Sequence, residues 1–224
     1  ADAFAAGVAE ALAAHGGALV GGDTVRSDQT VLALTALGSV PPGVPPGRGG
    51  GKAGDDLWLS GTVGDAGLGL ALLAGSRRTA DGTARAALVR RYRRPVPRLG
   101  LGLALRGLAS AMMDVSDGLL IDAARMAAAS GLVAELTLGG LPLGPAARSL
   151  LGDAPAVADL LDLATAGDDY ELLFAAPPAR HADVIAAGQA TRTPVTPIGR
   201  LAAGKGPLRL ADAPLPERLG WLHR

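Results

Sequence analysis

Apolar and polar residues recur with recognisable periods at the start of the chain. Residues 3–14 carry large apolar side chains four positions apart, which predicts a helix. Apolar residues at 18–20 and the alternating segment 31–40 predict two strands, with the polar turn 21–24 between them. The opening segment is therefore expected to hold one helix and two strands.

A change of composition follows this segment. The stretch Pro41 to Lys52 contains four Pro and five Gly residues. Pro lacks a backbone N–H, and such a mixture cannot continue a helix or a strand. We place a domain boundary in it, with residues 1–47 on one side and residues 48–224 on the other.

The rest of the chain switches repeatedly between strand and helix periods. Short apolar runs predict strands, and longer segments bounded by Asp, Gly or Pro predict helices. This order indicates an α/β or α+β fold. The expected elements are strands at 56–60, 111–113, 134–138 and 171–175 and near Val195 and Leu208, and helices after Asp65, on both sides of 93–98, and at 119–129, 156–163 and 179–187.

Composition narrows the class of protein. Hydrophobic residues make up 49% of the 224 residues, enough to bury a large core. Lys plus Arg and Asp plus Glu both number 21, which gives no reason to expect nucleic acid or anionic lipid as a partner. Cysteine is absent, which excludes disulfides and fits a cytoplasmic protein. No apolar run approaches the roughly 20 residues of a membrane span.

Three acidic turns follow or precede apolar strands. They contain Asp23, Asp114 with Asp117, and Asp168 with Asp169. Strand ends are common places for binding sites. These carboxylates are therefore the first candidates for chemistry.

The turn at Asp114, Ser116 and Asp117 has the residue types of a magnesium site. Residues two apart on an extended segment face the same side, and the turn can bring Asp117 to the same place. Mg²⁺ prefers hard oxygen ligands and often takes only one or two carboxylates together with substrate phosphates. The alternative is that Asp and Ser cap the helix that follows.

Phosphate binding is possible at two places in the first quarter of the chain. Gly22 lies in a turn whose backbone N–H groups a phosphate could approach, although two-glycine turns are common. No Gly-Lys-Ser/Thr follows, so this is not a Walker loop. Arg48 and Lys52 could hold nucleotide phosphates, although a basic residue in a linker is more often solvated.

Two further features each allow two interpretations. Trp221 could stack on an aromatic ligand or pin the tail of the chain to the core. The Arg-rich run 90–94 could bind an anion, but a charge run at a helix end is more typical of a solvated face. We expect the Arg run to be solvated.

Six motifs occur in a fixed order: Gly21-Gly22-Asp23-Thr24, Lys52-Ala53-Gly54-Asp55, Arg94-Pro95-Val96-Pro97-Arg98, Asp114-Val115-Ser116-Asp117-Gly118-Leu119, Gly167-Asp168-Asp169-Tyr170-Glu171-Leu172 and Gly220-Trp221-Leu222-His223. Together they resemble thiamine-monophosphate kinase over essentially all of the chain. The Asp-Val-Ser-Asp-Gly element is shared with the wider aminoimidazole ribonucleotide synthetase-like superfamily. The Arg-Pro-x-Pro-Arg and Gly-Asp-Asp-Tyr-Glu-Leu elements point to the kinase.

The resemblance implies an α+β, two-domain architecture of the aminoimidazole ribonucleotide synthetase type. Residues 1–47 would be the tail of an amino-terminal ATP-binding and dimerisation domain, and 48–224 the carboxy-terminal α+β domain. The implied activity is Mg²⁺-dependent transfer of the γ-phosphoryl group of ATP to thiamine monophosphate in a cytoplasmic homodimer. By the same resemblance the metal ligands are Asp23, Asp114 and Asp117, the ATP contacts are Gly22, Asp23, Arg48 and Ser116, and the substrate contacts are Asp168 and Trp221.

The chain departs from the family pattern in three respects. The family usually has Glu where Asp168 stands, and Arg48 aligns only across a small gap. The acidic Gly-Asp-Asp loop and Ser-Asp helix that open the family are not in this sequence, so the first domain is expected to be incomplete. Two alternatives stay open: another ATP-using member of the same superfamily, or a ligand-binding fragment without activity of its own.

Overall fold

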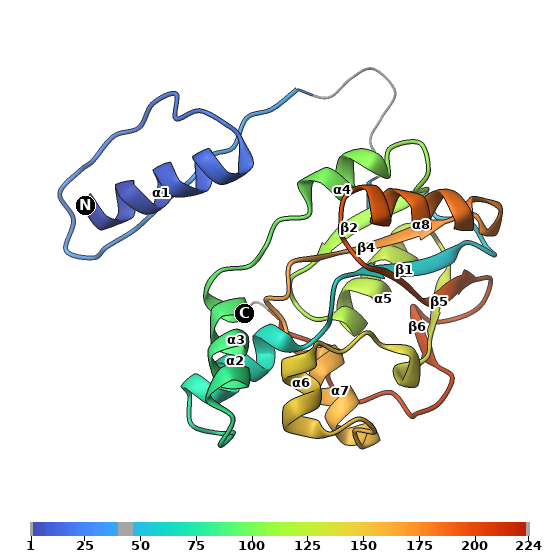
Figure 1. Cartoon of the computed structure of the whole chain (residues 1–224). Coiled ribbons are helices and arrows are strands. Elements are labelled where there is room, and N and C mark those ends of the chain that lie inside the picture. The colour runs from blue at the N-terminus through green and yellow to red at the C-terminus, as the bar shows by residue number, and fades with distance from the viewer. Residues whose placement is uncertain (1, 40–46, 223–224) are drawn as a thin grey trace. The chain divides into compact units, whose positions relative to one another are not determined.

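The computed structural model describes residues 2–39 and 47–222. The chain divides into two compact units, Ala1–Val44 and Pro45–Arg224. The positions of the two units relative to one another are not determined (Figure 1).

The first unit contains one helix followed by extended chain. Helix α1, Asp2–His15, confirms the helix expected at 3–14. It ends where the N–H of Gly16 donates to the carbonyl of Leu12 at 2.9 Å and Gly16 adopts a φ of 77°.

The two strands expected in the first unit are wrong within the described residues. No strand occurs in 16–39, and residue 40 lies outside the described part of the chain. A strand needs a paired neighbour for its N–H and C=O groups, and none lies beside these segments among the described residues. Their apolar side chains are consequently exposed, and Val20 and Leu37 are 89% and 86% accessible.

The second unit is built on one six-stranded mixed sheet. Its order is β2-β4-β1-β5-β3-β6. All neighbours are antiparallel except β3 and β6, which are parallel. The strands are β1 Asp56–Ser60, β2 Ala111–Val115, β3 Val133–Leu136, β4 Glu171–Ala176, β5 Val195–Ala202 and β6 Leu208–Leu210.

Helices cover both faces of this sheet (Figure 1). One face carries α4 and α8, whose apolar residues pack against Trp58 and Phe174. The opposite face carries α5. This arrangement confirms the α+β class expected from the sequence. The helices of the unit are α2 Asp65–Leu73, α3 Gly82–Arg93, α4 Leu99–Ala104, α5 Leu119–Ala129, α6 Pro145–Leu151, α7 Val157–Thr165 and α8 His181–Ala190, with single 3-10 turns at Leu138–Gly140 and Pro178–Arg180.

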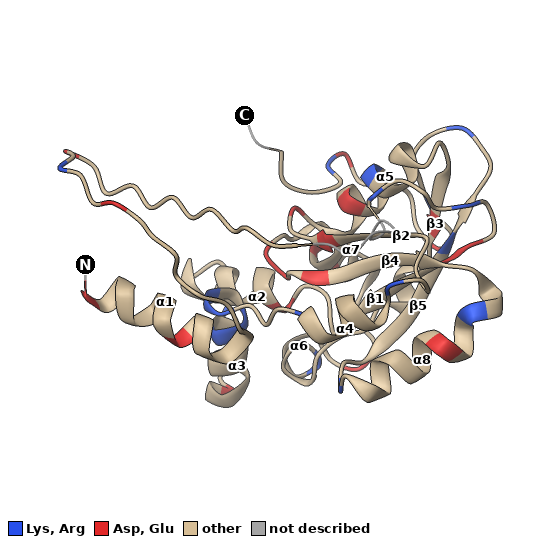
Figure 2. Ribbon diagram, turned by 90° about the horizontal axis from the view of Figure 1, so that it is seen from above, with Lys and Arg blue, Asp and Glu red and all other residues tan. Residues whose placement is uncertain are grey.

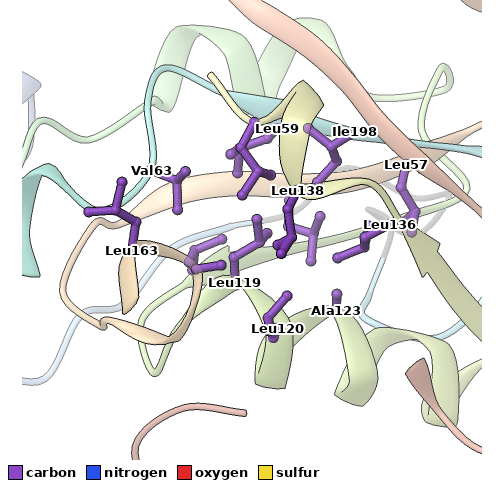
Figure 3. Close-up of a cluster of buried hydrophobic side chains, with 14 of the residues drawn as sticks. Leu57, Leu59, Val63, Leu119, Leu120, Ala123, Leu136, Leu138, Leu163 and Ile198 are labelled. Carbon is purple, nitrogen blue, oxygen red and sulfur yellow. The ribbon is translucent and has the colours of Figure 1, made fainter. Parts of the chain in front are cut away.

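The larger core lies between the sheet and α5. Figure 3 shows Leu119, Leu120 and Ala123 of α5 pointing toward side chains of β1 and β3. Leu57 and Leu119 are each 0% exposed. A fully buried Leu contributes about 2 kcal/mol through removal of apolar area from water. This packing fixes the start of α5, which directly follows the acidic turn 114–117.

Charged residues are distributed over the second unit without segregation by sign. Figure 2 shows acidic and basic residues interspersed along its ribbon, in keeping with the balanced composition. In the described ranges, 2–39 and 47–222, no helix is both long and apolar enough to cross a membrane.

Candidate functional site

The edge strand β2 carries the first acidic residue of the site. Asp114 is exposed and pairs across the ladder with Leu172 of β4. The sequence placed Asp114 in a turn, whereas the structure places it one residue before the end of β2. Its carboxylate therefore stands on a fixed backbone.

Two acidic turns that are far apart in sequence are joined at the end of β2. The N–H of Tyr170 donates to the carbonyl of Val115 at 2.8 Å, and the N–H of Asp168 donates to that of Ser116 at 2.9 Å. A Cβ atom on Gly167 would lie 2.5 Å from the Ser116 carbonyl oxygen, so only glycine permits this approach. The register of β2 and β4 thus brings 114–117 beside 167–170.

The second of these turns is strained. Asp168 and Tyr170 adopt φ angles of 68° and 50°. Asp is tolerated in this left-handed region, but a bulky Tyr there is an outlier that costs about 1–3 kcal/mol. Backbone hydrogen bonds to the neighbouring turn hold both residues in place. Such strain is typical of functional sites.

Asp114, Asp117 and Asp168 make up an acidic loop cluster on the two joined turns. The pKa of Tyr170 is raised, first by burial and then by the negative charges of Asp168, Asp114 and Asp117. The negative charges of all three carboxylates therefore act on Tyr170.

Asp117 is paired with a cation from α5. Nη1 of Arg125 donates to Oδ2 of Asp117 at 2.5 Å and to Oδ1 of Asp122 at 2.8 Å. These bonds raise the pKa of the Arg125 guanidinium, the one to Asp117 contributing most. The idea that Ser116 or Asp117 caps α5 is wrong, because the cap residue is Gly118 and no side chain caps the helix.

A buried ion network lies on the inner side of the second turn and consists of Arg91, Arg98, Asp169 and Glu171. Glu171 is 0% exposed. It accepts hydrogen bonds from Arg98 at 2.6 and 2.7 Å, from Ser60 at 2.5 Å, and from Arg91. The expectation of a solvated Arg run is wrong for Arg91, whose side chain is only 13% exposed.

Asp169 caps a helix from a distance. Its carboxylate accepts the N–H of Gly64 at 2.7 Å and of Ala66 at 3.2 Å, at the start of α2. Burial raises the pKa of Asp169 to about 7, against the lowering effect of these two hydrogen bonds. Asp168 thus belongs to the acidic loop cluster, whereas Asp169 and Glu171 bind other parts of the fold.

A groove opens beside the joined turns. It has a volume of about 450 Å³ and is lined by Leu70, Gly167, Arg218 and Trp221, among others. The N–H of Trp221 donates to the carbonyl of Asp117 at 2.8 Å. The Trp221 side chain is 66% exposed, so the tail is held by its backbone and not by burial of the ring.

The remaining predicted site residues lie before the acidic loop cluster in sequence. Gly22 and Asp23 belong to the first unit, where the Asp23 carboxylate accepts the N–H of Thr24 at 2.7 Å. Arg48 is exposed. The carbonyl of the neighbouring Gly47 accepts the N–H of Met112 at 2.9 Å, which places this segment along the free edge of β2.

The carboxylates of Asp114 and Asp117 are suitable ligands for a hard cation that also binds phosphate oxygens. Within residues 2–39 and 47–222, no group of three or more His, Cys, Asp or Glu side chains is arranged to hold a metal ion. Asp114 and Asp117 supply two carboxylates at the end of β2. That number matches Mg²⁺ sites in which substrate phosphates supply the remaining ligands. The residues present therefore fit Mg²⁺ that arrives with a nucleotide.

Comparison with known proteins decides the family. The family profile described as AIR synthase related protein, C-terminal domain, matches residues 52–208. The thiamine-monophosphate kinase of Caulobacter vibrioides is 42% identical over 99% of this chain and 63% of its own length. That of Aquifex aeolicus is 31% identical over 99% of this chain and 68% of its own length. The chain belongs to the thiamine-monophosphate kinase family.

A solved structure of this family supports the same assignment. The structure described as AaThiL complexed with AMPPCP and TMP is 31% identical, has a TM-score of 0.66, and covers 80% of this chain and 54% of its own. The chain spans about 63% of the Caulobacter thiamine-monophosphate kinase. The resemblance inferred from the six motifs is confirmed.

Proposed function

We propose that this protein transfers the γ-phosphoryl group of ATP to thiamine monophosphate and so forms thiamine diphosphate. The observation that carries the proposal is the acidic loop cluster, Asp114, Asp117 and Asp168, on two turns that backbone hydrogen bonds join at the end of β2. It lies beside the groove that ends at Trp221. Family membership supports the choice of substrates, since a relative's structure is described as complexed with AMPPCP and TMP.

The site divides into a nucleotide end and a substrate end. In the second unit, Asp114 and Asp117 would hold Mg²⁺, and Arg48 and Ser116 would contact ATP. The metal role of Asp23 and the ATP contact of Gly22, both in the first unit, stay predictions from the family resemblance. Bound Mg²⁺ would neutralise phosphate charge and align the reacting phosphates. Asp168 and Trp221 would bind the acceptor in the groove, the indole ring covering an aromatic ring of the substrate.

The transfer requires no general base. An acceptor phosphate has its second pKa near about 6 and is already anionic at neutral pH. The difficulty is that two anions must approach each other in line. Fixed carboxylates on the strand end and on the strained turn can position a cation there without moving during the reaction. Asp114, which is exposed at the end of an ordered strand, is best placed for this role.

We also propose a homodimer located in the cytoplasm. The first unit exposes Leu19, Val20, Leu34 and Leu37, each at least 74% accessible. These side chains would be covered by the part of the relatives' length that this chain does not span, by a second copy of the chain, or by both. The lack of cysteine is in keeping with a reducing compartment.

The proposed activity is tested with the 224-residue chain, Mg²⁺, ATP and thiamine monophosphate. We expect thiamine diphosphate and ADP in equal amounts by chromatography, and no ATP consumption without thiamine monophosphate. ATP turnover with selenide or an aminoimidazole precursor instead would support another member of the superfamily. Binding of both ligands without turnover would show a ligand-binding fragment and contradict the kinase activity of this chain.

Substrate binding in the groove has its own optical test. Trp58 is 1% exposed, whereas Trp221 is 66% exposed. Thiamine monophosphate is therefore expected to quench the fluorescence of Trp221 alone. The Trp221→Phe variant should lose the response, and a response that persists in this variant would remove Trp221 from the substrate site.

A further inference from the structure

The turn that carries Ser116 and Asp117 is held by a side chain from the first turn of α5. Asp122 is 0% exposed. Its Oδ2 atom accepts the backbone N–H groups of both Ser116 and Asp117 at 3.0 Å. A single carboxylate oxygen thus fixes two consecutive peptide groups of the proposed ATP and metal turn.

The same carboxylate also fixes a side chain of the site. Oδ1 of Asp122 accepts a hydrogen bond from Nη1 of Arg125 at 2.8 Å, and the same nitrogen donates to Oδ2 of Asp117. Asp122 and Arg125 are three residues apart on α5, where side chains are neighbours. The position of the Asp117 carboxylate therefore depends on Asp122 through Arg125.

Asp122 can hold the turn because the helix dipole and three hydrogen-bond donors stabilise its buried negative charge. A carboxylate in the first turn of a helix interacts favourably with the helix dipole. Its two oxygens receive three hydrogen bonds, as full burial of a charge requires. Removal of the carboxylate would leave the N–H groups of the turn without their acceptor and would leave Arg125 with Asp117 as its acidic partner.

We propose that Asp122 is a positioning residue that presents Ser116 and Asp117 to the nucleotide and its metal. It contacts the backbone of the turn and Arg125, and it acts on the ligands only through them. The inference rests on the proposed function, since it assigns a task within that same site.

The test compares Asp122→Asn and Asp122→Ala with a matched control. Asp55 is also buried, at 4% exposure, and accepts hydrogen bonds from the N–H of Lys52 and from Ser110. Ser110 precedes β2, so Asp55 lies at the end of the strand away from the acidic turn. The Asp55→Asn variant therefore reports the general cost of neutralising a buried Asp.

Two readouts are measured on the 224-residue chain. We expect Mg²⁺-dependent binding of AMPPCP, followed by calorimetry, to weaken about tenfold or more in Asp122→Asn and further in Asp122→Ala. Asp55→Asn should bind AMPPCP like the parent chain. Hydrogen exchange should become faster at the amides of Ser116 and Asp117 in the Asp122 variants only.

The exchange readout keeps this inference separate from the proposed function. If the parent chain does not bind AMPPCP, the proposed function fails, while faster exchange at Ser116 and Asp117 still supports the positioning role. Unchanged exchange and unchanged AMPPCP binding in Asp122→Asn would overturn it. An equal loss of binding in Asp55→Asn would overturn it as well, because the effect would then be general destabilisation.

Discussion

The segment 168–171 contains three acidic residues with two kinds of surroundings. Asp169 and Glu171 point inward, where helix N–H groups and Arg side chains satisfy them. Asp168 belongs to the acidic loop cluster with Asp114 and Asp117, and the charges of all three raise the pKa of Tyr170. The inward carboxylates receive hydrogen bonds or ion pairs from the protein itself. In the cluster, Arg125 pairs with Asp117, and a cationic ligand can compensate the remaining negative charge.

This difference separates stability from binding within one turn. The buried ion network ties α3, β4 and the start of α2 together, so its loss should damage the fold. The acidic loop cluster lies at an exposed strand end, so its loss should leave the fold intact and remove ligand binding.

The largest effect on stability is expected from Glu171→Gln. The guanidinium groups of Arg91 and Arg98 would lose the Glu171 carboxylate, which neutralises them and is 0% exposed. Breaking a buried pair in this way costs about 3 kcal/mol or more of unfolding free energy. Urea denaturation measures the change.

The control for Glu171→Gln is Glu135→Gln. Glu135 pairs with Arg200 and Arg209 at the protein surface. Surface ion pairs contribute little to stability, so the unfolding free energy should hardly change. Equal losses in the two variants would mean that the buried ion network has no special structural role.

A smaller, pH-dependent effect is expected from Asp169→Asn. The pKa of Asp169 is about 7 in the folded chain, against 3.8 as its ordinary value. The folded state therefore binds more protons between these values, and the contribution of Asp169 to stability falls as pH rises through this window. The variant should show a flatter dependence of unfolding free energy on pH between about 4 and 7. A slope equal to that of the parent chain would contradict the raised pKa.

The smallest effect is expected from Asp168→Asn. Asn tolerates the left-handed backbone of this residue, with its φ of 68°, so stability should be unchanged. Loss of one charged contact should weaken binding of thiamine monophosphate roughly tenfold, equivalent to about 1.5 kcal/mol. Calorimetry measures the binding, with Asp183→Asn on α8 as the control. A marked loss of stability in Asp168→Asn would assign this residue to the structural set.

Local signals in the sequence were sufficient for many elements of the second unit. The helix expected at 119–129 matches α5, because Gly118 and Gly131 mark its ends and its apolar face is continuous. α6 was not expected, since its seven residues are too few to show a clear period. The strands expected at 18–20 and 31–40 were not found in the described residues, because strand formation depends on a partner.

The candidate site was only partly predictable. The acidic turns were visible in the sequence, but the contact between 114–117 and 167–170 depends on the register of β2 and β4, which spacing does not reveal. Asp168 and Asp169 are adjacent and chemically identical, and only the backbone angles decide which one faces inward. A signal for Asp122 and Arg125 did exist, namely their three-residue spacing on α5.

The central claim is that Asp114 binds the cation that accompanies the nucleotide. It is tested most directly by calorimetry of thiamine monophosphate with Mg²⁺ and AMPPCP, for the parent chain, Asp114→Asn, and Asp153→Asn as an exposed control. We expect Mg²⁺-dependent binding that is lost in Asp114→Asn and kept in Asp153→Asn, with equal thermal stability in all three. Binding by Asp114→Asn that equals the parent chain at every Mg²⁺ concentration would contradict it.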